Sequence, residues 1–152
     1  MGESKLAAEL AIRSLVARYC DGVARRDSDL WGATWAADGE WSLLGSRARG
    51  RAEVVALFRK LLEQLPSVIQ FPGAGTVEVG DGAATGRHYV SELGKTSGGG
   101  ALFTLGVYDD EYTRASGEWL FARRSFTRIY MGPPDLSAPF SPVAGGGGGK
   151  DS

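Results

Sequence analysis

The clearest sign of the fold is ALFTLGVYDDEYTRASGEWLFARRSFTRIY, residues 101–130, in which apolar and polar residues alternate along both halves. Alternation with a period of two is typical of a strand with one buried face. The segment ASG, residues 115–117, separates the halves and has the composition of a tight turn. The stretch therefore predicts a hairpin of two antiparallel strands. If Arg114 pairs with Glu118, then Asp109 lies opposite Arg123 and Tyr108 opposite Arg124.

Three more strands are predicted upstream of this hairpin, at residues 67–71, 76–79 and 84–93. Their connections are PGAG, GDG and GKTSGGG, all rich in glycine. Glycine-rich turns between consecutive strands indicate an antiparallel meander. The strand at 84–93 carries the single histidine of the chain, and alternation places Gly86, His88, Val90 and Glu92 on one of its faces. Both faces are mixed in character, so alternation does not tell which face is concave.

Helical periodicity replaces this alternation before residue 66. A first helix is predicted from about Leu6 to Arg25, with Tyr19 on its buried stripe. Asp27 or Ser28 caps a short second helix with Trp31 and Trp35 facing inward, a strand passes through Trp41, and a third helix ends at Pro66. Helices followed by strands predict an α+β fold, in which three N-terminal helices pack in a strongly curved, mainly antiparallel sheet. We expect one domain over residues 1–131 and a Pro/Gly-rich tail over 132–152, whose last ten residues are flexible.

Composition excludes several classes of function. The formal net charge is −1 and no basic patch stands out, so we expect no nucleic-acid partner. The single cysteine, Cys20, excludes an internal disulfide and fits a buried thiol in a reducing compartment. Charges interrupt each apolar run of the N-terminal segment, which argues against a signal peptide or membrane span. We therefore expect a cytoplasmic protein with no membrane partner.

Two motifs fail on their spacing. GKTSGGG lacks the first glycine of a phosphate-binding loop, because Tyr89 occupies that position. YDDEY places Asp109 and Glu111 on one strand face and Asp110 on the other, so the three carboxylates do not converge. We therefore expect neither a metal nor a cofactor.

The segments RYCDGVARRDSDLWGATWAADGEW, GRAEVVALF and GVYDDEYTRASGEWLFARRSF resemble the SnoaL-like branch of the nuclear transport factor 2-like superfamily. The resemblance covers roughly residues 6–131 and implies a cone-like α+β barrel with a deep apolar pocket. Its members include hexachlorocyclohexane dehydrochlorinase, scytalone dehydratase and ketosteroid isomerase, alongside domains that only bind ligands or partners. Such relatives commonly form dimers or trimers, so we expect a homodimer or homotrimer.

Family site residues transfer poorly onto this chain. The dyad of the dehydrochlorinase falls near Ala24 and Gln70, neither of which can perform its chemistry, and its arginine falls near Thr127 or Arg128. A strand histidine of scytalone dehydratase corresponds to His88, and a tyrosine of ketosteroid isomerase corresponds to Tyr19. The dehydrochlorinase reaction is therefore expected to be absent.

The resulting hypothesis is a lyase, dehydratase or isomerase that abstracts a proton from a small, largely apolar molecule. His88 would be the general base, since an imidazole accepts a proton at neutral pH, and Tyr19 would donate a hydrogen bond to developing negative charge. The other candidates bind substrate: Gln70, Tyr108 and Arg128 through polar groups, and Trp31, Trp35, Trp41, Phe58 and Phe103 as apolar walls.

Other interpretations stay open. His88 is equally typical of a hydrogen-bonded core histidine, and Tyr19 and the tryptophans are typical of core packing. The pocket could belong to a non-catalytic domain that binds a small hydrophobic ligand. A third possibility is an assembly domain that uses exposed apolar residues on the last two strands.

Overall fold

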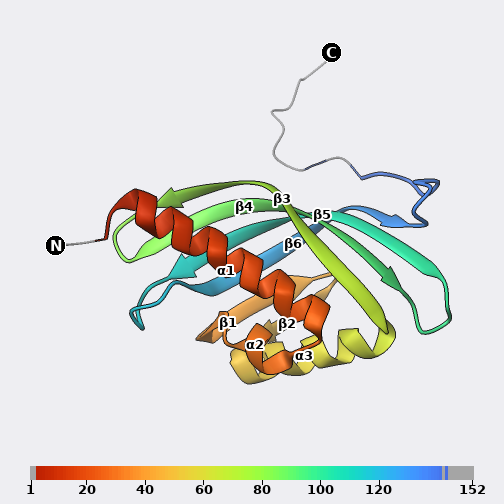
Figure 1. Ribbon diagram of the computed structural model, residues 1–152, viewed down its shortest axis with the longest axis horizontal. Helices are drawn as coiled ribbons and strands as arrows, with labels where there is room; N and C mark the ends of the chain where they lie inside the picture. Colours follow the sequence, from red (N-terminus) through yellow and green to blue (C-terminus); the bar gives the residue numbers. More distant parts are fainter. Residues whose placement is uncertain (1–2, 142, 144–152) are drawn as a thin grey trace, which may run out of the picture.

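Six strands form one bent sheet, and the long first helix crosses its concave face (Figure 1). The computed structural model describes residues 3–141 and 143. The elements in chain order are α1 (Lys5–Arg25), α2 (Ser28–Gly32), β1 (Trp35–Leu43), β2 (Ser46–Arg49), α3 (Arg51–Gln64), β3 (Ser67–Val79), β4 (Ala83–Lys95), β5 (Ala101–Thr113) and β6 (Leu120–Gly132). The strand order is β2-β1-β6-β5-β4-β3, and all neighbours are antiparallel except β1 and β6. The predicted α+β class and curved sheet are confirmed, but β2 and β3 remain as two edges and the sheet is not a closed barrel.

Local chemistry explains where the first two helices begin and end. The Ser4 hydroxyl accepts a hydrogen bond from the Ala7 amide and caps α1. α1 ends at Arg25. The residue that follows, Arg26, has a left-handed backbone, and the Asp27 carboxylate then caps α2. The buried stripe of α1 includes Tyr19 and Cys20. Burial raises the pKa of the Cys20 thiol to about 11, so this cysteine is no thiolate nucleophile at neutral pH.

Three predicted boundaries differ from the structure. α2 ends at Gly32 and Trp35 opens β1, so Trp35 is a strand residue rather than part of the second helix. The segments 67–71 and 76–79 belong to one strand, β3, because a register shift between Pro72 and Gly75 absorbs the PGAG segment. The short strand β2 follows the turn at Leu44 and Gly45 and was not predicted.

The predicted register of the β5–β6 hairpin is wrong by two residues. Tyr108 lies opposite Phe126, Asp109 opposite Ser125, and Asp110 opposite Arg124. The turn accounts for one residue, since Thr113 lies opposite Leu120, and a register shift between the Tyr112–Phe121 and Glu111–Arg123 pairs accounts for the other. Together they bring Asp110 and Arg124 into register on the concave face.

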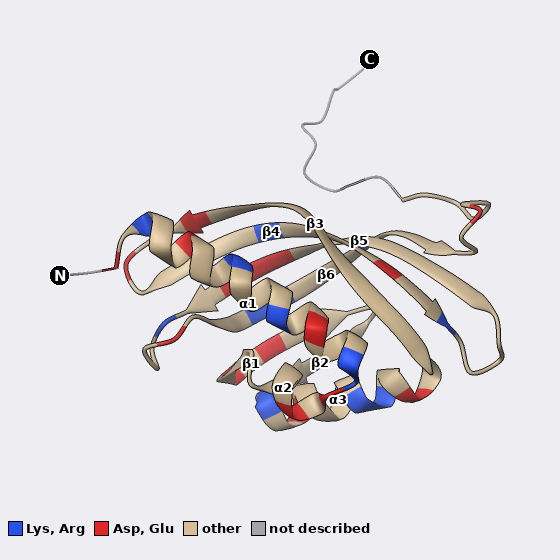
Figure 2. Ribbon diagram, viewed as in Figure 1, with Lys and Arg blue, Asp and Glu red and all other residues tan. Residues whose placement is uncertain are grey.

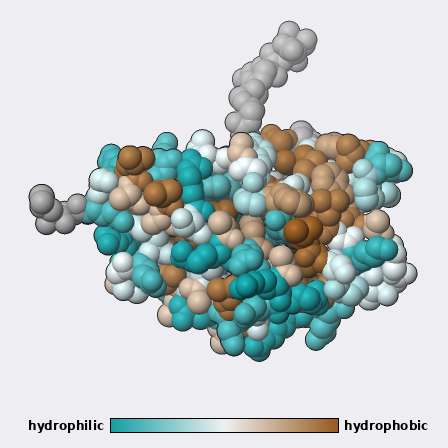
Figure 3. Space-filling view, in the orientation of Figure 1, coloured by the Kyte–Doolittle hydropathy of each residue, from teal (hydrophilic) through white to brown (hydrophobic). Residues whose placement is uncertain are grey.

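The outer surface carries both charged and apolar residues. Acidic and basic residues are interspersed along α1 in Figure 2. Apolar side chains gather in Figure 3 at the end of the molecule where β3 approaches α3. Ile69, Phe71, Tyr89 and Leu93, on β3 and β4, are among the exposed large apolar residues. They occupy different strands from the last two, where sequence alternation placed such residues.

The described segment that follows β6 folds back on that strand. Phe140 packs against Tyr130 with ring centroids 4.8 Å apart, and the Tyr130 hydroxyl donates to the Pro133 carbonyl at 2.6 Å. The expected flexibility of the last ten residues concerns a stretch that, apart from Val143, lies outside the described residues. No helix of the described part is long and apolar enough to cross a membrane. The expected homodimer or homotrimer stays a prediction.

Candidate active site

A cavity of about 360 Å³ lies between α1, α3 and the concave face of the sheet. Apolar side chains form most of its wall, among them Val23, Phe58, Leu62, Val68, Val90 and Phe126. Besides Gln64, Thr96 and Ser97, two groups of polar residues interrupt the apolar wall. One contains Tyr19, Trp41 and Tyr108, and the other contains Gln70, Glu92 and Thr104. Such a cavity suits a small, largely apolar molecule that carries a few polar atoms.

Five of the ten predicted site residues line the cavity and five do not. The cavity is lined by Tyr19, Trp41, Phe58, Gln70 and Tyr108. The residues that do not line it are His88, Trp31, Trp35, Phe103 and Arg128. The expected convergence of His88 and Tyr19 on one cavity is therefore not found.

Two phenols meet at the first polar group. The hydroxyls of Tyr19 and Tyr108 lie 3.3 Å apart, and the Trp41 indole N–H donates to the Tyr108 hydroxyl at 3.3 Å. Burial raises the pKa of both phenols, so both are neutral donors at physiological pH. Two phenols carry two protons, and the bond between them uses one. The second proton is available to an acceptor atom in the cavity.

A buried ion pair supports the phenols. Arg124 is 2% exposed, and its Cζ lies 3.8 Å from the Tyr108 ring centroid and 4.4 Å from that of Tyr19. Its Nε donates to Asp110 Oδ1 at 2.8 Å and its Nη2 to Oδ2 at 3.1 Å. Burial alone would raise the pKa of Asp110, but the Arg124 charge and hydrogen bonds to the carboxylate outweigh it and lower that pKa. The positive charge is thus fixed beside both phenol rings.

The arginine that lies beside the two phenols is Arg124 and not the predicted Arg128. Arg128 is exposed on β6, opposite Gly106, and does not line the cavity. The arrangement around Arg124 follows from the hairpin register described above. The predicted register placed Arg124 opposite Tyr108, two residues away from its actual partner, Asp110.

Glu92, like Thr104, lines the cavity but was not among the predicted site residues. It is a carboxyl group in a mainly apolar wall, and Gln70 Nε2 donates to its Oε2 at 2.7 Å. Burial raises the pKa of Glu92, and the hydrogen bond from Gln70 opposes this rise only in part. Burial also raises the pKa of Tyr108, and the Glu92 charge adds to it, so the carboxyl group and the phenol lie within electrostatic range. Its position on the His88 face of the strand was the available signal.

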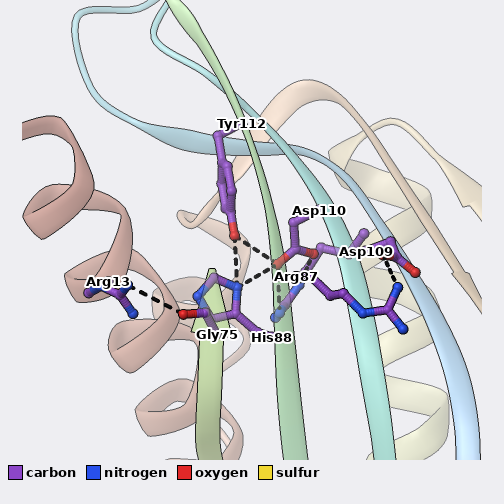
Figure 4. Close-up of polar contacts among 8 residues, drawn as sticks. Arg13, Gly75, Arg87, His88, Asp109, Asp110 and Tyr112 are labelled. Carbon is purple, nitrogen blue, oxygen red and sulfur yellow. Dashed lines mark hydrogen bonds and ion pairs between the residues drawn. The ribbon is translucent and has the colours of Figure 1, made fainter. Parts of the chain in front are cut away.

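His88 belongs to a buried network beneath α1 (Figure 4). The ring is 4% exposed, and its Nδ1 lies 3.1 Å from the Tyr112 hydroxyl and 3.4 Å from Asp110 Oδ2. Because the Tyr112 hydroxyl donates to Asp110 Oδ2 at 2.9 Å, it accepts from His88 Nδ1–H. The geometry matches a core histidine that is held by a carboxylate. A catalytic role for His88 stays a prediction, and the ring has no place on the cavity wall.

The acidic run YDDEY splits between the two faces as predicted. Asp109 is exposed and pairs with Arg87 at 3.1 Å on the outer face, while Asp110 is buried (Figure 4). Within residues 3–141 and 143, no three His, Cys, Asp or Glu side chains gather as a metal site would require.

Gly75 makes room for the His88 ring. A Cβ on Gly75 would lie 2.2 Å from His88 Cδ2, closer than any real contact. We expect Gly75→Ala to lower the free energy of unfolding by about 1–3 kcal/mol, as overpacking of a core does. Urea denaturation measures the change. Gly73→Ala, where the nearest atom is 3.4 Å away, is the matched control. Equal stability of the two variants would contradict this account of His88.

The remaining predicted residues lie behind or outside the cavity wall. Trp31 is fully buried and stacks on Phe58 with centroids 4.0 Å apart, so it supports a lining residue. Trp35 is fully buried in the same aromatic core. Phe103 packs near Tyr130, with centroids 6.2 Å apart. These three residues were predicted to form apolar walls of the pocket, but they do not line the cavity.

The comparisons with known proteins agree with this architecture. The profile of the SnoaL-like domain matches residues 4–125. The chain belongs to the SnoaL-like family. A search of curated proteins gave no match.

Solved structures share the fold of this SnoaL-like chain at low identity. A type 2 hexachlorocyclohexane dehydrochlorinase is 24% identical with a TM-score of 0.81, and the match covers 92% of this chain and 97% of that one. The type 3 enzyme from Novosphingobium barchaimii LL02 is 24% identical with a TM-score of 0.79, over 91% and 97% of the two chains. A candidate scytalone dehydratase from Novosphingobium aromaticivorans DSM 12444 is 17% identical with a TM-score of 0.79, over 92% and 95%. At these identities the likeness establishes the fold.

Proposed function

We propose that this SnoaL-like protein is a lyase or isomerase that abstracts a proton from a small, largely apolar molecule. The observation that carries the proposal is the presence of Glu92 and of the Tyr19–Tyr108 pair on the wall of one apolar cavity. The first supplies a proton acceptor and the second a hydrogen-bond donor, which are the two groups that such a step needs. The neighbouring dehydrochlorinase and dehydratase folds are consistent with this class of reaction.

The roles follow from the chemistry of each group. Glu92 takes the proton from carbon, and its raised pKa makes it a stronger base than an exposed carboxylate. The electron pair of the broken C–H bond moves toward an acceptor atom of the substrate, and this atom accepts a hydrogen bond from the phenol. Arg124 faces both phenol rings, so its positive charge stabilises negative charge that develops at their hydroxyls. Each step uses side chains of the protein itself.

Deuterium exchange tests the proposal without knowledge of the natural substrate. We expect the protein to accelerate exchange of the protons beside the carbonyl of 2-tetralone, 2-indanone or acetophenone in D2O, followed by proton NMR. These ketones are neutral and largely apolar, and each carries a carbon acid next to an acceptor oxygen. Tyr108→Phe should slow the exchange because it removes one phenol proton.

The alternative is a domain that binds a small hydrophobic ligand without changing it. The residues at the family dyad positions, Ala24 and Gln70, favour this alternative. Under this alternative, the ketones bind in titration calorimetry, but their protons exchange with D2O no faster than in buffer. That result would contradict the proposed reaction.

A further inference from the structure

Three neighbouring strands place one polar residue each at the same level of the cavity wall. Gln70 lies opposite Glu92 in the β3–β4 register, and Glu92 lies opposite Thr104 in the β4–β5 register. Adjacent strands are about 4.8 Å apart, so the three side chains form one continuous row. All three line the cavity. We call Gln70, Glu92 and Thr104 the polar row.

The polar row holds two buried atoms without partners. In the described part of the chain, five buried side-chain polar atoms lack a hydrogen bond: Trp31 Nε1, Trp35 Nε1, Gln70 Oε1, His88 Nε2 and Thr104 Oγ1. Only those of Gln70 and Thr104 belong to residues that line the cavity. Thr104 is only 6% exposed. A buried polar group without a partner destabilises a protein, so such a pair beside an empty space points to a ligand.

The chemistry of the two atoms identifies the missing group. The Gln70 amide donates its N–H to Glu92, which leaves its Oε1 as a pure acceptor. The Thr104 hydroxyl can both donate and accept. A ligand hydroxyl is a suitable partner for either atom, since a hydroxyl can donate to Gln70 Oε1 and can accept from Thr104 Oγ1–H. A methyl group or a halogen in the same place satisfies neither side chain.

The phenols of Tyr19 and Tyr108 determine which chemical group the ligand carries at its other end. Thr104 and Tyr108 are four residues apart on β5, so their Cα atoms lie about 13 Å apart along the strand, and both residues line the cavity. The free phenol proton requires an acceptor such as a carbonyl oxygen. The Glu92 carboxylate in the row disfavours an anionic group there.

We propose that the polar row selects neutral substrates that carry a hydroxyl group at one end and a hydrogen-bond acceptor at the other, with Gln70 and Thr104 as the specificity-determining residues. The inference rests on the proposed function only in that it calls the bound molecule a substrate. As a statement about binding it does not depend on turnover.

Two matched probes test the selection. 4-(Hydroxymethyl)acetophenone carries the hydroxyl and the carbonyl at opposite ends, and 4-ethylacetophenone replaces the hydroxyl with a methyl group of similar size. We expect the first to bind about tenfold more tightly in titration calorimetry, the effect of one well-placed hydrogen-bonded group. Thr104→Val, which keeps the shape of the side chain, should reduce this preference to near unity.

Thr96→Val is the control. Thr96 also lines the cavity, but its hydroxyl already bonds the Gly100 carbonyl at 3.4 Å, so the preference should persist. Thr104→Val should also raise the melting temperature of the ligand-free protein, because it removes a buried group without a partner. Equal binding of the two probes, no binding of the hydroxyl probe at millimolar concentration, or an unchanged preference in Thr104→Val would each overturn the inference.

The two proposals fail in different ways. Probe discrimination without deuterium exchange leaves a binding domain that selects hydroxylated ligands. Exchange without discrimination leaves an enzyme whose specificity lies elsewhere.

Discussion

Replacing Arg124 with methionine is expected to lower the free energy of unfolding by about 3–5 kcal/mol. The substitution leaves Asp110 as a buried charge without its cation, although Tyr112 and His88 still lie beside its carboxylate. It also removes the guanidinium from the faces of the Tyr19 and Tyr108 rings. Burial would raise the pKa of Asp110 once the positive charge is gone, so the variant carboxyl group is expected to take up a proton more readily.

Urea denaturation of Arg124→Met beside Arg123→Met measures this effect with a neighbour as the control. Arg123 is half exposed and its ion pairs with Glu40 and Glu111 are 3.7 Å long, so its loss should change stability little. The pH dependence supplies a second check. The pKa of Asp110 is lowered in the folded protein, so its stabilising contribution is present above the unfolded pKa and is lost as the pH falls through the folded pKa. Similar losses in the two arginine variants would contradict a structural role for the buried pair.

Side-chain periodicity predicted the elements well and the register poorly. The period-two pattern correctly placed Gly86, His88, Val90 and Glu92 on one face, and the helical stripe correctly buried Tyr19. A register shift changes no residue's intrinsic preference, so the shift at Glu111 left no signal in the pattern. The pairing of strands in the folded sheet determines which carboxylate lies opposite an arginine.

Candidate site residues were predictable where their chemistry matched their surroundings. Tyr19 sits on an apolar stripe, and both the pattern and the structure bury it. Glu92 is a charged residue, and charged residues on strands normally face solvent. His88 attracted a catalytic interpretation because it is the only imidazole, but its carboxylate partner, Asp110, lies 22 residues further along the chain. Contacts of this kind depend on tertiary structure.

Replacing Glu92 with glutamine is expected to slow deuterium exchange by about 10²–10⁴-fold, the usual contribution of a general base. The amide keeps the size of the side chain and can still bond Gln70, but it cannot accept a proton from carbon. In the unmodified protein, the rate should rise with pH through the pKa of Glu92, which lies above that of an ordinary glutamate because of burial. The variant should lack this rise. Proton NMR in buffered D2O across a range of pH measures both effects.

Stability separates loss of a base from loss of structure. A raised pKa means that the folded state binds the Glu92 proton more tightly than the unfolded state does. Stability from this group is therefore complete below the unfolded pKa and is lost as the pH rises through the folded pKa. Glu92→Gln removes that loss, so above the folded pKa the variant should be more stable than the unmodified protein while being far less active. A variant that loses both stability and exchange would show instead that Glu92 supports the fold, and the proton acceptor would have to be sought elsewhere on the cavity wall.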